Sequence, residues 1–364
     1  MSSKSRNAKP KARQKAVRPR GSVIDLFCGV GGLSHGFSQE GYKIVAGVDV
    51  DEACRYPYEI NNRAPFIAKD VGRLSAEYVA SLFVPREPKI LVGCAPCQPF
   101  SKYNQKNDDP KWRLVNRFSA LIRKVRPDII SMENVPRLLE FRSGKVFSEF
   151  KTELEDAGYK VWHKVVFAPD YGIPQSRHRL VLLASKHGNI ELLPGRLNEK
   201  NYITVRKAIG HLPRLAAGGF NRRDPLHRAS ALSDRNLKRI QASSPGGSWQ
   251  DWDDDLVATC HQEHSGQGYR SVYGRMRYDE PAPTITTQFF GFGNGRFGHP
   301  TQDRAISLRE GAILQSFPPN YVFQEPNTPI HMKTLGRLIG NAVPVLLGKA
   351  IAKSIRRHID EQKL

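Results

Sequence analysis

The 364-residue sequence lacks several features that would place it in common protein classes. It has no run of about 18 apolar residues, the length that a membrane-spanning helix needs, and no apolar signal region near the N-terminus. It has five cysteines, an odd number without regular spacing, which argues against a secreted disulfide framework. No internal repeat is found. These absences predict a soluble protein of a reducing, intracellular compartment.

The few cysteines also argue against a structural metal. Cys94 and Cys97 form a CxxC pair, which by spacing alone suits half a zinc site or a redox couple. A structural zinc ion needs four ligands, but Cys28, Cys54 and Cys260 are scattered and no histidine lies at finger spacing. We therefore expect no metal. A redox pair predicts a reversible disulfide between the two CxxC cysteines, and this alternative leaves most of the chain unexplained.

Acidic residues are a clear minority. The sequence has 56 Lys and Arg against 35 Asp and Glu, a formal net charge of +21. Residues 1–20 carry eight of the basic residues and no acid, which predicts a basic disordered tail. Subtracting these eight charges from +21 leaves +13 on the rest of the chain. A positive field of this size favours encounter with nucleic acid.

The most informative segment that is present is GCAPCQPFS at residues 93–101. It follows the apolar run Ile90-Leu91-Val92, which is typical of a buried parallel strand. Cys97 then lies between Pro96 and Pro99, on a rigid turn at the carboxyl end of that strand. Ligands of open α/β sheets bind at this edge, where a nucleophilic thiol can meet them.

Two segments before this one predict a cofactor site at the same edge. Residues 23–33 are a short apolar strand that runs into a turn with glycines at 29, 31 and 32. The next predicted strand, residues 43–48, ends at Asp49, which is placed to bind the two hydroxyls of a ribose. The full GxGxxG fingerprint is missing. A nucleoside cofactor without a pyrophosphate therefore fits better than NAD.

Further strands complete the predicted fold. A strand near residues 127–135 places Glu133 at the same edge as Cys97, and two reactive side chains at neighbouring strand ends are what a shared active site requires. Residues 161–168 and 179–184 are two more predicted strands. After residue 186 the sequence becomes irregular and rich in Gly, Pro, Arg and Ser, and a helix returns up to about residue 358. We predict an α/β protein with a second, smaller irregular domain.

Six motifs in this order resemble those of one family, the AdoMet-dependent DNA (cytosine-5) methyltransferases of bacterial and phage modification systems. The resemblance covers residues 22 to about 358. It is carried by DLFCGVGG at 25–32, PCQ at 96–98, ENV at 133–135, QSRHR at 175–179, residues 277–287, and GNAVP at 340–344. It implies a Rossmann-like methyltransferase sheet built from residues 21–186 and 338–360, with residues 187–337 as the DNA target-recognition domain.

The resemblance also implies catalytic roles. Cys97 is the nucleophile that bonds to C6 of cytosine, because C5 is a poor nucleophile until electron density is pushed onto it. Glu133 binds the N3 and 4-amino edge of the base, and burial would have to raise its pKa for it to donate a proton. Arg179 holds the cytosine O2, and Arg177 braces the site and a backbone phosphate.

For the cofactor S-adenosyl-L-methionine, the resemblance implies a set of binding residues spread over the sheet edge. The turn of Phe27, Gly29 and Gly31 holds the methionine portion. Asp49, where the family most often has Glu, holds the ribose, and Val50 stacks on the cofactor. The remaining residues of the set are Asp70 and Val71 for the adenine, with Pro96, Leu114, Asn341 and Val343 lining the same pocket. In this picture Cys94 is a buried packing residue.

A cytosine inside a duplex cannot reach a buried thiol, so the base must be flipped out of the double-stranded DNA. The loop from residue 101 to about 113 is polar and basic, and we expect it to close over the DNA. The expected DNA contacts are Gln98, Ser101, Lys102, Gln175, Arg222 and Arg223. The short irregular segment after residue 186 predicts one compact recognition unit and one short target site.

Two alternatives stay open at this stage. An RNA-methylating branch of the same family shares these motifs, and labelled methyl incorporation into DNA or tRNA would separate the two. A nucleic-acid-binding relative without catalysis is disfavoured because Cys97, Glu133 and Arg179 are all present. For the leading interpretation we expect a monomer in the cytoplasm of a prokaryote, associated with the nucleoid and not with a membrane. A functionally paired restriction endonuclease, without a stable complex, is a further expected partner.

Overall fold

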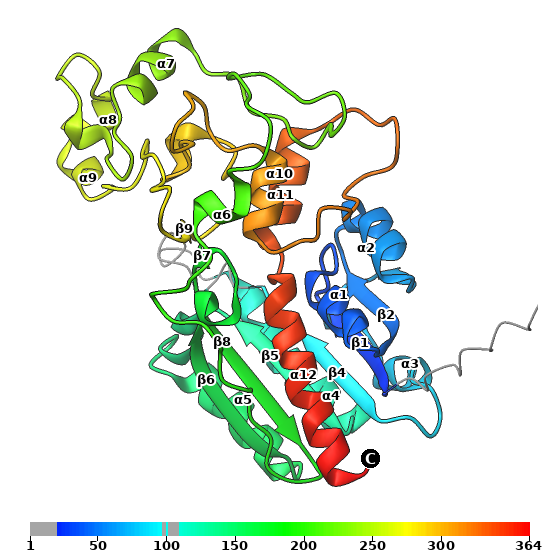
Figure 1. Ribbon diagram of the computed structural model, residues 1–364. Helices are drawn as coiled ribbons and strands as arrows, with labels where there is room; N and C mark the ends of the chain where they lie inside the picture. Colours follow the sequence, from blue (N-terminus) through cyan, green and yellow to red (C-terminus); the bar gives the residue numbers. More distant parts are fainter. Residues whose placement is uncertain (1–19, 97–99, 101–108) are drawn as a thin grey trace, which may run out of the picture.

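A computed structural model describes residues 20–96, 100 and 109–364 (Figure 1). Four residues expected to act on the substrate, Cys97, Gln98, Ser101 and Lys102, lie outside the described residues, as does most of the predicted basic tail. The expected closure of the loop after Cys97 also falls largely on this part of the chain.

A seven-stranded sheet in the order β3-β2-β1-β4-β5-β8-β6 forms the centre of the molecule. Neighbouring strands from β3 to β5 pair in parallel, whereas β8 runs antiparallel to both β5 and β6. This arrangement confirms the predicted Rossmann-like α/β class. The strands are β1 Ser22–Leu26, β2 Lys43–Asp49, β3 Phe66–Ala68, β4 Lys89–Gly93, β5 Ile129–Asn134, β6 Lys160–Phe167 and β8 His178–Ser185.

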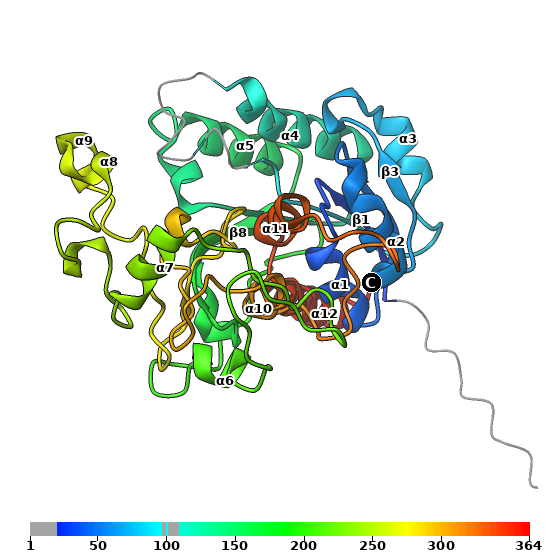
Figure 2. The ribbon, with the colours of Figure 1, turned by 90° about the horizontal axis from the view of Figure 1, so that it is seen from above.

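Alternating apolar residues give the sheet two buried faces. In β1, Val23 belongs to one hydrophobic core and Ile24 to the other, as expected when successive side chains point to opposite faces. One core is completed by α1 Gly32–Gln39, α2 Arg55–Asn62 and α12 Val345–Gln362. The other is completed by α3 Ala76–Ser81, α4 Arg113–Val125 and α5 Lys145–Asp156, so helices cover both faces of the sheet (Figures 1 and 2).

The contact between α1 and α12 depends on two glycines. A Cβ atom added to Gly36 would lie 2.4 Å from the backbone nitrogen of Lys349, and one added to Gly348 would lie 2.9 Å from the carbonyl oxygen of Leu33. Both distances are shorter than a carbon can approach a backbone atom without displacing it. The missing side chains therefore allow the first and last helices to pack backbone against backbone.

The chain after residue 186 lies mostly above the carboxyl edge of the sheet and is dominated by loops (Figure 1). Its outer part has a small core of its own, formed by Ile240, Trp249, Trp252, Phe292 and Ala305. Other residues of this region belong to the sheet core that α1, α2 and α12 complete. Its elements are α6 Val205–Ile209, α7 Asp234–Gln241, α8 Thr259–Gln262, α9 His264–Gln267, β9 Ala282–Pro283, α10 Leu308–Leu314 and α11 Met332–Asn341, with β9 pairing in parallel to β7 Gln175–Ser176.

A buried ion pair fixes the start of α10. Both terminal nitrogens of Arg304 donate to the carboxylate of Glu310, at 2.8 and 2.7 Å, and both side chains are almost completely inaccessible. Glu310 also accepts from the backbone of Ser307, which in turn caps the helix. His299 lies beside this pair, and burial lowers its pKa to about 4, so its imidazole is neutral at pH 7.

The end of the chain contains one long apolar helical stretch. The helical stretch Met332–Gln362 is apolar enough to cross a membrane by length and composition, but 72% of its most apolar window is buried inside the protein. Such burial is what the core helix of a globular protein shows.

Short 3-10 helices complete the described structure at Glu52–Cys54, Val71–Arg73, Pro110–Trp112, Pro136–Leu139, Ala168–Tyr171, Trp249–Asp251 and Phe292–Asn294.

Candidate active site

A cavity of about 620 Å³ opens at the carboxyl edge of β1, β2 and β4. This is the crevice where strand order reverses between β1 and β4, and ligands of open α/β sheets bind at such a point. The cavity brings together nearly all of the residues expected to bind the cofactor. Those that line it are Phe27, Gly29, Asp49, Val50, Asp70, Val71, Pro96, Leu114, Asn341 and Val343.

Asp49 holds the glycine-rich turn in place. Its Oδ2 accepts a hydrogen bond from the backbone N–H of Gly29 at 2.9 Å, and its Oδ1 accepts from the N–H of Asp51 at 3.0 Å. Burial raises its pKa above the usual range of an aspartate. Phe27 and Gly29 both adopt left-handed backbone conformations, with φ of 60° and 50°, which shape the turn. Asp49 thus has a structural partner in addition to facing the cavity.

Gly31 departs from the expected set, because it is not among the described residues that line the cavity. It precedes α1 with φ of 88°, and an added Cβ would lie 2.2 Å from the side-chain nitrogen of Asn62 on α2. Its expected contact with the cofactor remains a prediction. Residue 31 must be a glycine because the turn packs closely against α2.

Asp25 is an acidic residue of the cavity that sequence reasoning did not single out. It is 1% exposed, lines the cavity, and accepts a hydrogen bond from the Ser34 hydroxyl at 2.7 Å. Burial raises its pKa to about 7, and the nearby carboxyl of Asp49 adds to the effect. S-Adenosylmethionine carries positive charge on its sulfonium and amino groups, so a wall with the buried Asp25 carboxyl and the partly buried Asp49 carboxyl fits this cofactor.

Arg337 is a second residue that the sequence did not indicate. It extends from α11 to the cavity wall, where its guanidinium forms an ion pair with Asp51, with Nη2 at 3.3 Å from Oδ1. The pair joins the last part of the chain to the loop after β2. One signal was available: Arg337 lies four residues before Asn341, so both occupy the same face of α11.

Glu133 lies at the end of β5 and is 2% exposed. Its Oε1 is 3.0 Å from Nε of Arg179, whose side chain is 12% exposed. Its Oε2 accepts a hydrogen bond from the thiol of Cys94 at 2.9 Å. Arg179 reaches this position because β8 runs antiparallel beside β5, with Leu180 opposite Asn134. The structure thus brings together Glu133 and Arg179 as the sequence predicted, and adds Cys94, which was expected only to pack.

The described chain approaches Cys97 along the cavity wall. Ala95 accepts a hydrogen bond from the side-chain amide of Asn134 at 3.1 Å, and Pro96 lines the cavity. The predicted nucleophile is the next residue in sequence. Cys97 itself lies outside the described residues, so its role remains a prediction.

Gln175 was expected to contact DNA, and this expectation is corrected. Its side chain is 0% exposed, and its nitrogen donates to the Leu314 carbonyl at 3.1 Å and to Gln315 Oε1 at 3.0 Å. Its oxygen accepts from the backbone N–H of Ile285 and from Arg177. With every polar group engaged inside the protein, Gln175 connects the segment before β8 to the region around α10.

Arg177 has a related position. It is 6% exposed, and its Nη1 donates to Gln175 and to the carbonyl of Ile285, both at 3.3 Å. These contacts fit the expected bracing of the site. The expected phosphate contact of Arg177 remains a prediction.

Arg222 and Arg223 are exposed in the loop before α7. The loop is fastened to α10 by the ion pair of Asp224 with Arg309, at 2.6 Å, and by a hydrogen bond from the backbone N–H of Arg309 to the Leu226 carbonyl at 3.0 Å. Their contact with DNA remains a prediction. Among residues 20–96, 100 and 109–364, no group of three His, Cys, Asp or Glu side chains is placed to hold a metal ion.

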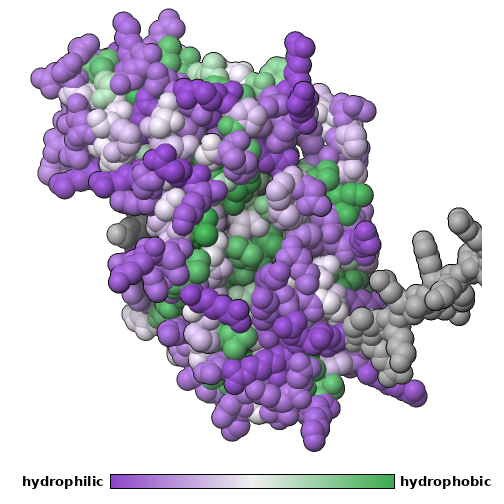
Figure 3. Space-filling model, in the orientation of Figure 1, coloured by the Kyte–Doolittle hydropathy of each residue, from purple (hydrophilic) through white to green (hydrophobic). Residues whose placement is uncertain are grey.

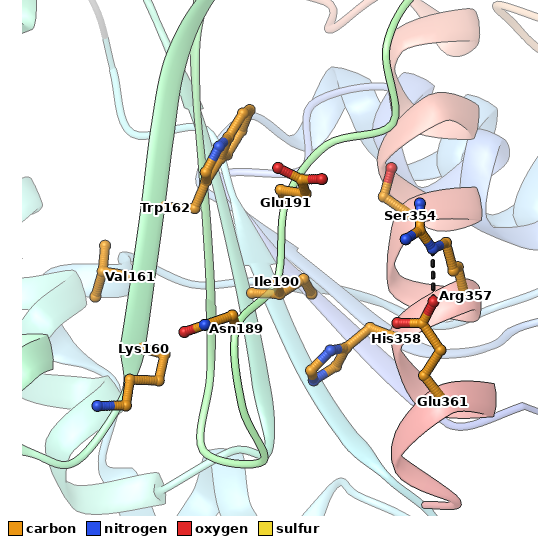
Figure 4. Close-up of a pocket in the computed structure, with 10 residues that line it drawn as sticks. All are labelled: Lys160, Val161, Trp162, Asn189, Ile190, Glu191, Ser354, Arg357, His358 and Glu361. Atoms are coloured by element: carbon orange, nitrogen blue, oxygen red, sulfur yellow. Dashed lines mark hydrogen bonds and ion pairs between the residues drawn. The ribbon is translucent and has the colours of Figure 1, made fainter.

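A second, smaller cavity of about 280 Å³ lies at the opposite edge of the sheet (Figure 4). Lys160, at the start of β6, lines it together with Arg357 and His358 from the last turns of α12. Arg357 donates to Glu361 across its rim at 2.7 Å. None of the expected site residues lines this cavity.

On the face shown in Figure 3, hydrophobic residues gather mainly near the middle of the molecule, and most of the remaining surface is hydrophilic.

The site geometry can be set against known proteins. Residues 21–357 match the sequence model of the family described as C-5 cytosine-specific DNA methylase. The Type II methylase M.HgiDII of Herpetosiphon aurantiacus is 54% identical over 341 residues, which cover 93% of this chain and 96% of that protein. The Type II methyltransferase M1.HphI of Haemophilus parahaemolyticus is 32% identical over 339 residues, covering 92% of this chain and 86% of that protein.

A solved structure supports the fold. The crystal structure of a prophage-encoded DNA modification methyltransferase of E. coli superposes with a TM-score of 0.70 and 22% sequence identity. The match covers 93% of this chain and 99% of that one. At this identity the likeness concerns the fold alone.

Proposed function

The chain belongs to the C-5 cytosine-specific DNA methylase family, and from this we propose that Cys97 and Glu133 act together on a cytosine flipped out of double-stranded DNA. The family is AdoMet-dependent, and the protein is a DNA (cytosine-5) methyltransferase. The single observation that carries the proposed roles is the buried Glu133–Arg179 pair beside the cofactor cavity. A carboxyl group and a guanidinium at one point can together bind the 4-amino, N3 and O2 groups along the hydrogen-bonding edge of a cytosine.

The proposed chemistry begins at the base. The Cys97 thiolate adds to C6, which pushes electron density toward C5. Glu133 binds the N3 and 4-amino edge and donates or shares a proton there, which neutralises the negative charge that develops on the ring. Arg179 holds O2, and Arg177 keeps the segment of Arg179 in place through Gln175. After C5 is methylated, it loses its proton and Cys97 is eliminated, which restores the free thiol.

S-Adenosylmethionine, when bound, supplies the methyl group. In our proposal its methionine portion lies at the turn of Phe27, Gly29 and Gly31. Its ribose lies at Asp49 and its adenine at Asp70 and Val71, with Val50 stacking on the cofactor. Pro96, Leu114, Asn341 and Val343 complete the pocket. The acidic lining and the left-handed turn described above support this assignment, and no metal is part of the proposed chemistry.

DNA recognition is proposed for the region after the sheet. Residues 187–337 would form the recognition domain, with residues 21–186 and 338–360 as the catalytic domain. Arg222 and Arg223 would contact DNA there, and Gln98, Ser101 and Lys102 would contact it from the segment around the nucleophile. We also propose that the protein acts as a monomer in a prokaryotic cytoplasm, near the nucleoid. There it would protect sites from a functionally paired restriction endonuclease.

Covalent trapping tests this proposal. A duplex with 5-fluorocytosine at the target cannot lose the C5 substituent, so the protein with S-adenosylmethionine should form an adduct that survives denaturing electrophoresis. Cys97→Ser should form none, and a matched tRNA substrate should not be trapped. An adduct that persists in Cys97→Ser, or one that forms only on RNA, would contradict the assignment.

A further inference from the structure

Cys94 is the cysteine of the CxxC pair to which the proposed chemistry gives no task. It follows β4, and its backbone N–H donates to the carbonyl of Leu26 at the end of β1, at 3.3 Å. Its side chain is partly buried and lines the cofactor cavity. Its thiol donates to Oε2 of Glu133 at 2.9 Å. One residue thus links the ends of β1, β4 and β5.

A second hydrogen bond runs in the opposite direction beside the first. The amide nitrogen of Asn134 donates to the carbonyl of Ala95 at 3.1 Å. Two consecutive residues after β4 are therefore joined to two consecutive residues at the end of β5. This double link sets the position of Glu133 relative to the segment that leads into Cys97.

The two oxygens of Glu133 have different partners. Oε1 faces Arg179 and Oε2 faces Cys94, while the side chain is only 2% exposed. The terminal torsion of a glutamate is soft, so a contact at one oxygen leaves the carboxylate free to rotate. A thiol is a weak donor, but a carboxylate acceptor strengthens the hydrogen bond. The second contact therefore determines the plane of the carboxylate.

We propose that Cys94 is a positioning residue for Glu133, and that its thiol orients the carboxylate toward the cytosine edge. The inference rests on the proposed role of Glu133 in base binding. A residue that only packs would have no need of a polar partner.

This inference is tested by substitutions of Cys94 that change its hydrogen-bond donor and its side-chain volume separately. Cys94→Ala and Cys94→Val remove the donor, and Cys94→Val also fills the space, whereas Cys94→Ser keeps a donor. We expect both donor-free variants to lower the single-turnover rate of methyl transfer about tenfold, the effect of losing a hydrogen bond to a charged group. Cys94→Ser should stay within about threefold of the unsubstituted protein. The KM for DNA and the Kd for S-adenosylmethionine should change less than about twofold.

A double-mutant cycle shows whether Cys94 acts through Glu133. In a Glu133→Gln background, adding Cys94→Ala should lower the remaining rate by less than about twofold. Full additivity would overturn the inference in favour of packing, as would a normal rate in Cys94→Val. Cys260→Ala, at an exposed cysteine of α8, is the matched control. If the unsubstituted protein makes no 5-methylcytosine, the proposed function itself fails; if it does and Cys94→Val equals it, only this inference fails.

Discussion

At the scale of single residues, burial determines how two carboxyl groups of the candidate active site behave. Asp25 and Glu133 are both nearly inaccessible, yet their partners differ. Glu133 faces a guanidinium and a thiol, whereas Asp25 has a hydroxyl donor and a neighbouring acid. A charged form needs compensation when water is removed. The site therefore has Glu133 beside the cavity with a cationic partner, and Asp25 in the cavity wall with a pKa raised to about 7.

The raised pKa of Asp25 predicts a pH dependence of stability. The folded protein binds a proton at this group between pH 3.8 and about 7, where the unfolded chain has released it. Stability is therefore lost as pH rises through that window, by roughly 4 kcal/mol at most. Asp25→Asn does not titrate, so its free energy of unfolding relative to the unsubstituted protein should increase from pH 4.5 to pH 8. Urea unfolding without cofactor measures this difference.

Asp279→Asn is the control for this prediction. Asp279 is exposed, and the hydrogen bond from Arg206 lowers its pKa below 3.8. Its contribution to stability is lost only as pH falls below about 4. The difference between Asp279→Asn and the unsubstituted protein should therefore stay constant from pH 5 to pH 8. A parallel trend in both variants would contradict the assignment to Asp25.

At the scale of elements, the helices are held by contacts that are distant in sequence. The pair of α1 and α12 joins the start of the chain to its end, and α11 supplies Arg337 to a cavity formed by strand ends. Gln315, just after α10, donates to the Ile339 carbonyl of α11 at 2.9 Å and accepts from Gln175 before β8. Buried amides thus connect three segments that each contribute to the site.

The α1–α12 contact should not tolerate a methyl group. In Gly36→Ala the new Cβ would meet the backbone of α12, which cannot rotate away as a side chain can. We expect a loss of about 1–3 kcal/mol in the free energy of unfolding, despite the better helix propensity of alanine. Thermal and urea unfolding measure the change. Gly268→Ala, where an added Cβ has nothing within 4 Å, should remain within about 0.5 kcal/mol.

The buried pair at α10 should be similarly sensitive. Arg304→Met leaves the Glu310 carboxylate buried without its main partner, which typically costs about 3–5 kcal/mol. The double variant Arg304→Met/Glu310→Leu should recover part of this loss because no charge is left alone. Arg357→Met removes a solvent-exposed ion pair with Glu361 and should change stability by less than about 1 kcal/mol. Urea unfolding measures these changes. Equal losses of stability in Arg304→Met and Arg357→Met would contradict this account.

At the scale of the whole molecule, an acidic cavity lies within a strongly basic protein. The net charge of +21 favours approach to DNA, whereas Asp25 and Asp49 line the pocket that would take a cationic cofactor. Because Lys69, Lys111 and Arg337 line the cavity beside its aspartates, the proposed cofactor pocket is closer to electrical balance than the chain as a whole.

The basic N-terminal segment predicts a change in salt dependence. Deletion of residues 2–19 removes seven of its eight Lys and Arg and leaves Arg20, which pairs with Asp360 at 3.5 Å. If any of the seven contact phosphates, the slope of log K against log salt should become shallower by about 0.9 for each. Titration of duplex DNA at several salt concentrations gives the slope. We expect a decrease of at least about one, with an unchanged single-turnover rate; an unchanged slope would contradict a DNA role for the segment.

The sequence by itself determined which residues gather at the sheet edge. Parallel strands place their carboxyl ends side by side, so Asp49, Cys97 and Glu133 could be assigned to one crevice from the positions of the apolar runs. The order of the motifs also identified the family, because each motif is a short continuous segment that can be found without knowledge of the fold. The strands 160–167 and 178–185 were found within one residue of their observed limits.

Only the tertiary structure decided the contacts that cross long stretches of chain. The antiparallel direction of β8, which brings Arg179 to Glu133, is not encoded in the period of an apolar strand. The burial of Gln175, the pair of Arg337 with Asp51 and the thiol contact of Cys94 all depend on which segments become neighbours. Local patterns report the preference of a residue for a strand or a turn. The partner of a polar side chain is set by packing, because burial makes each donor and acceptor take whatever group the fold places beside it.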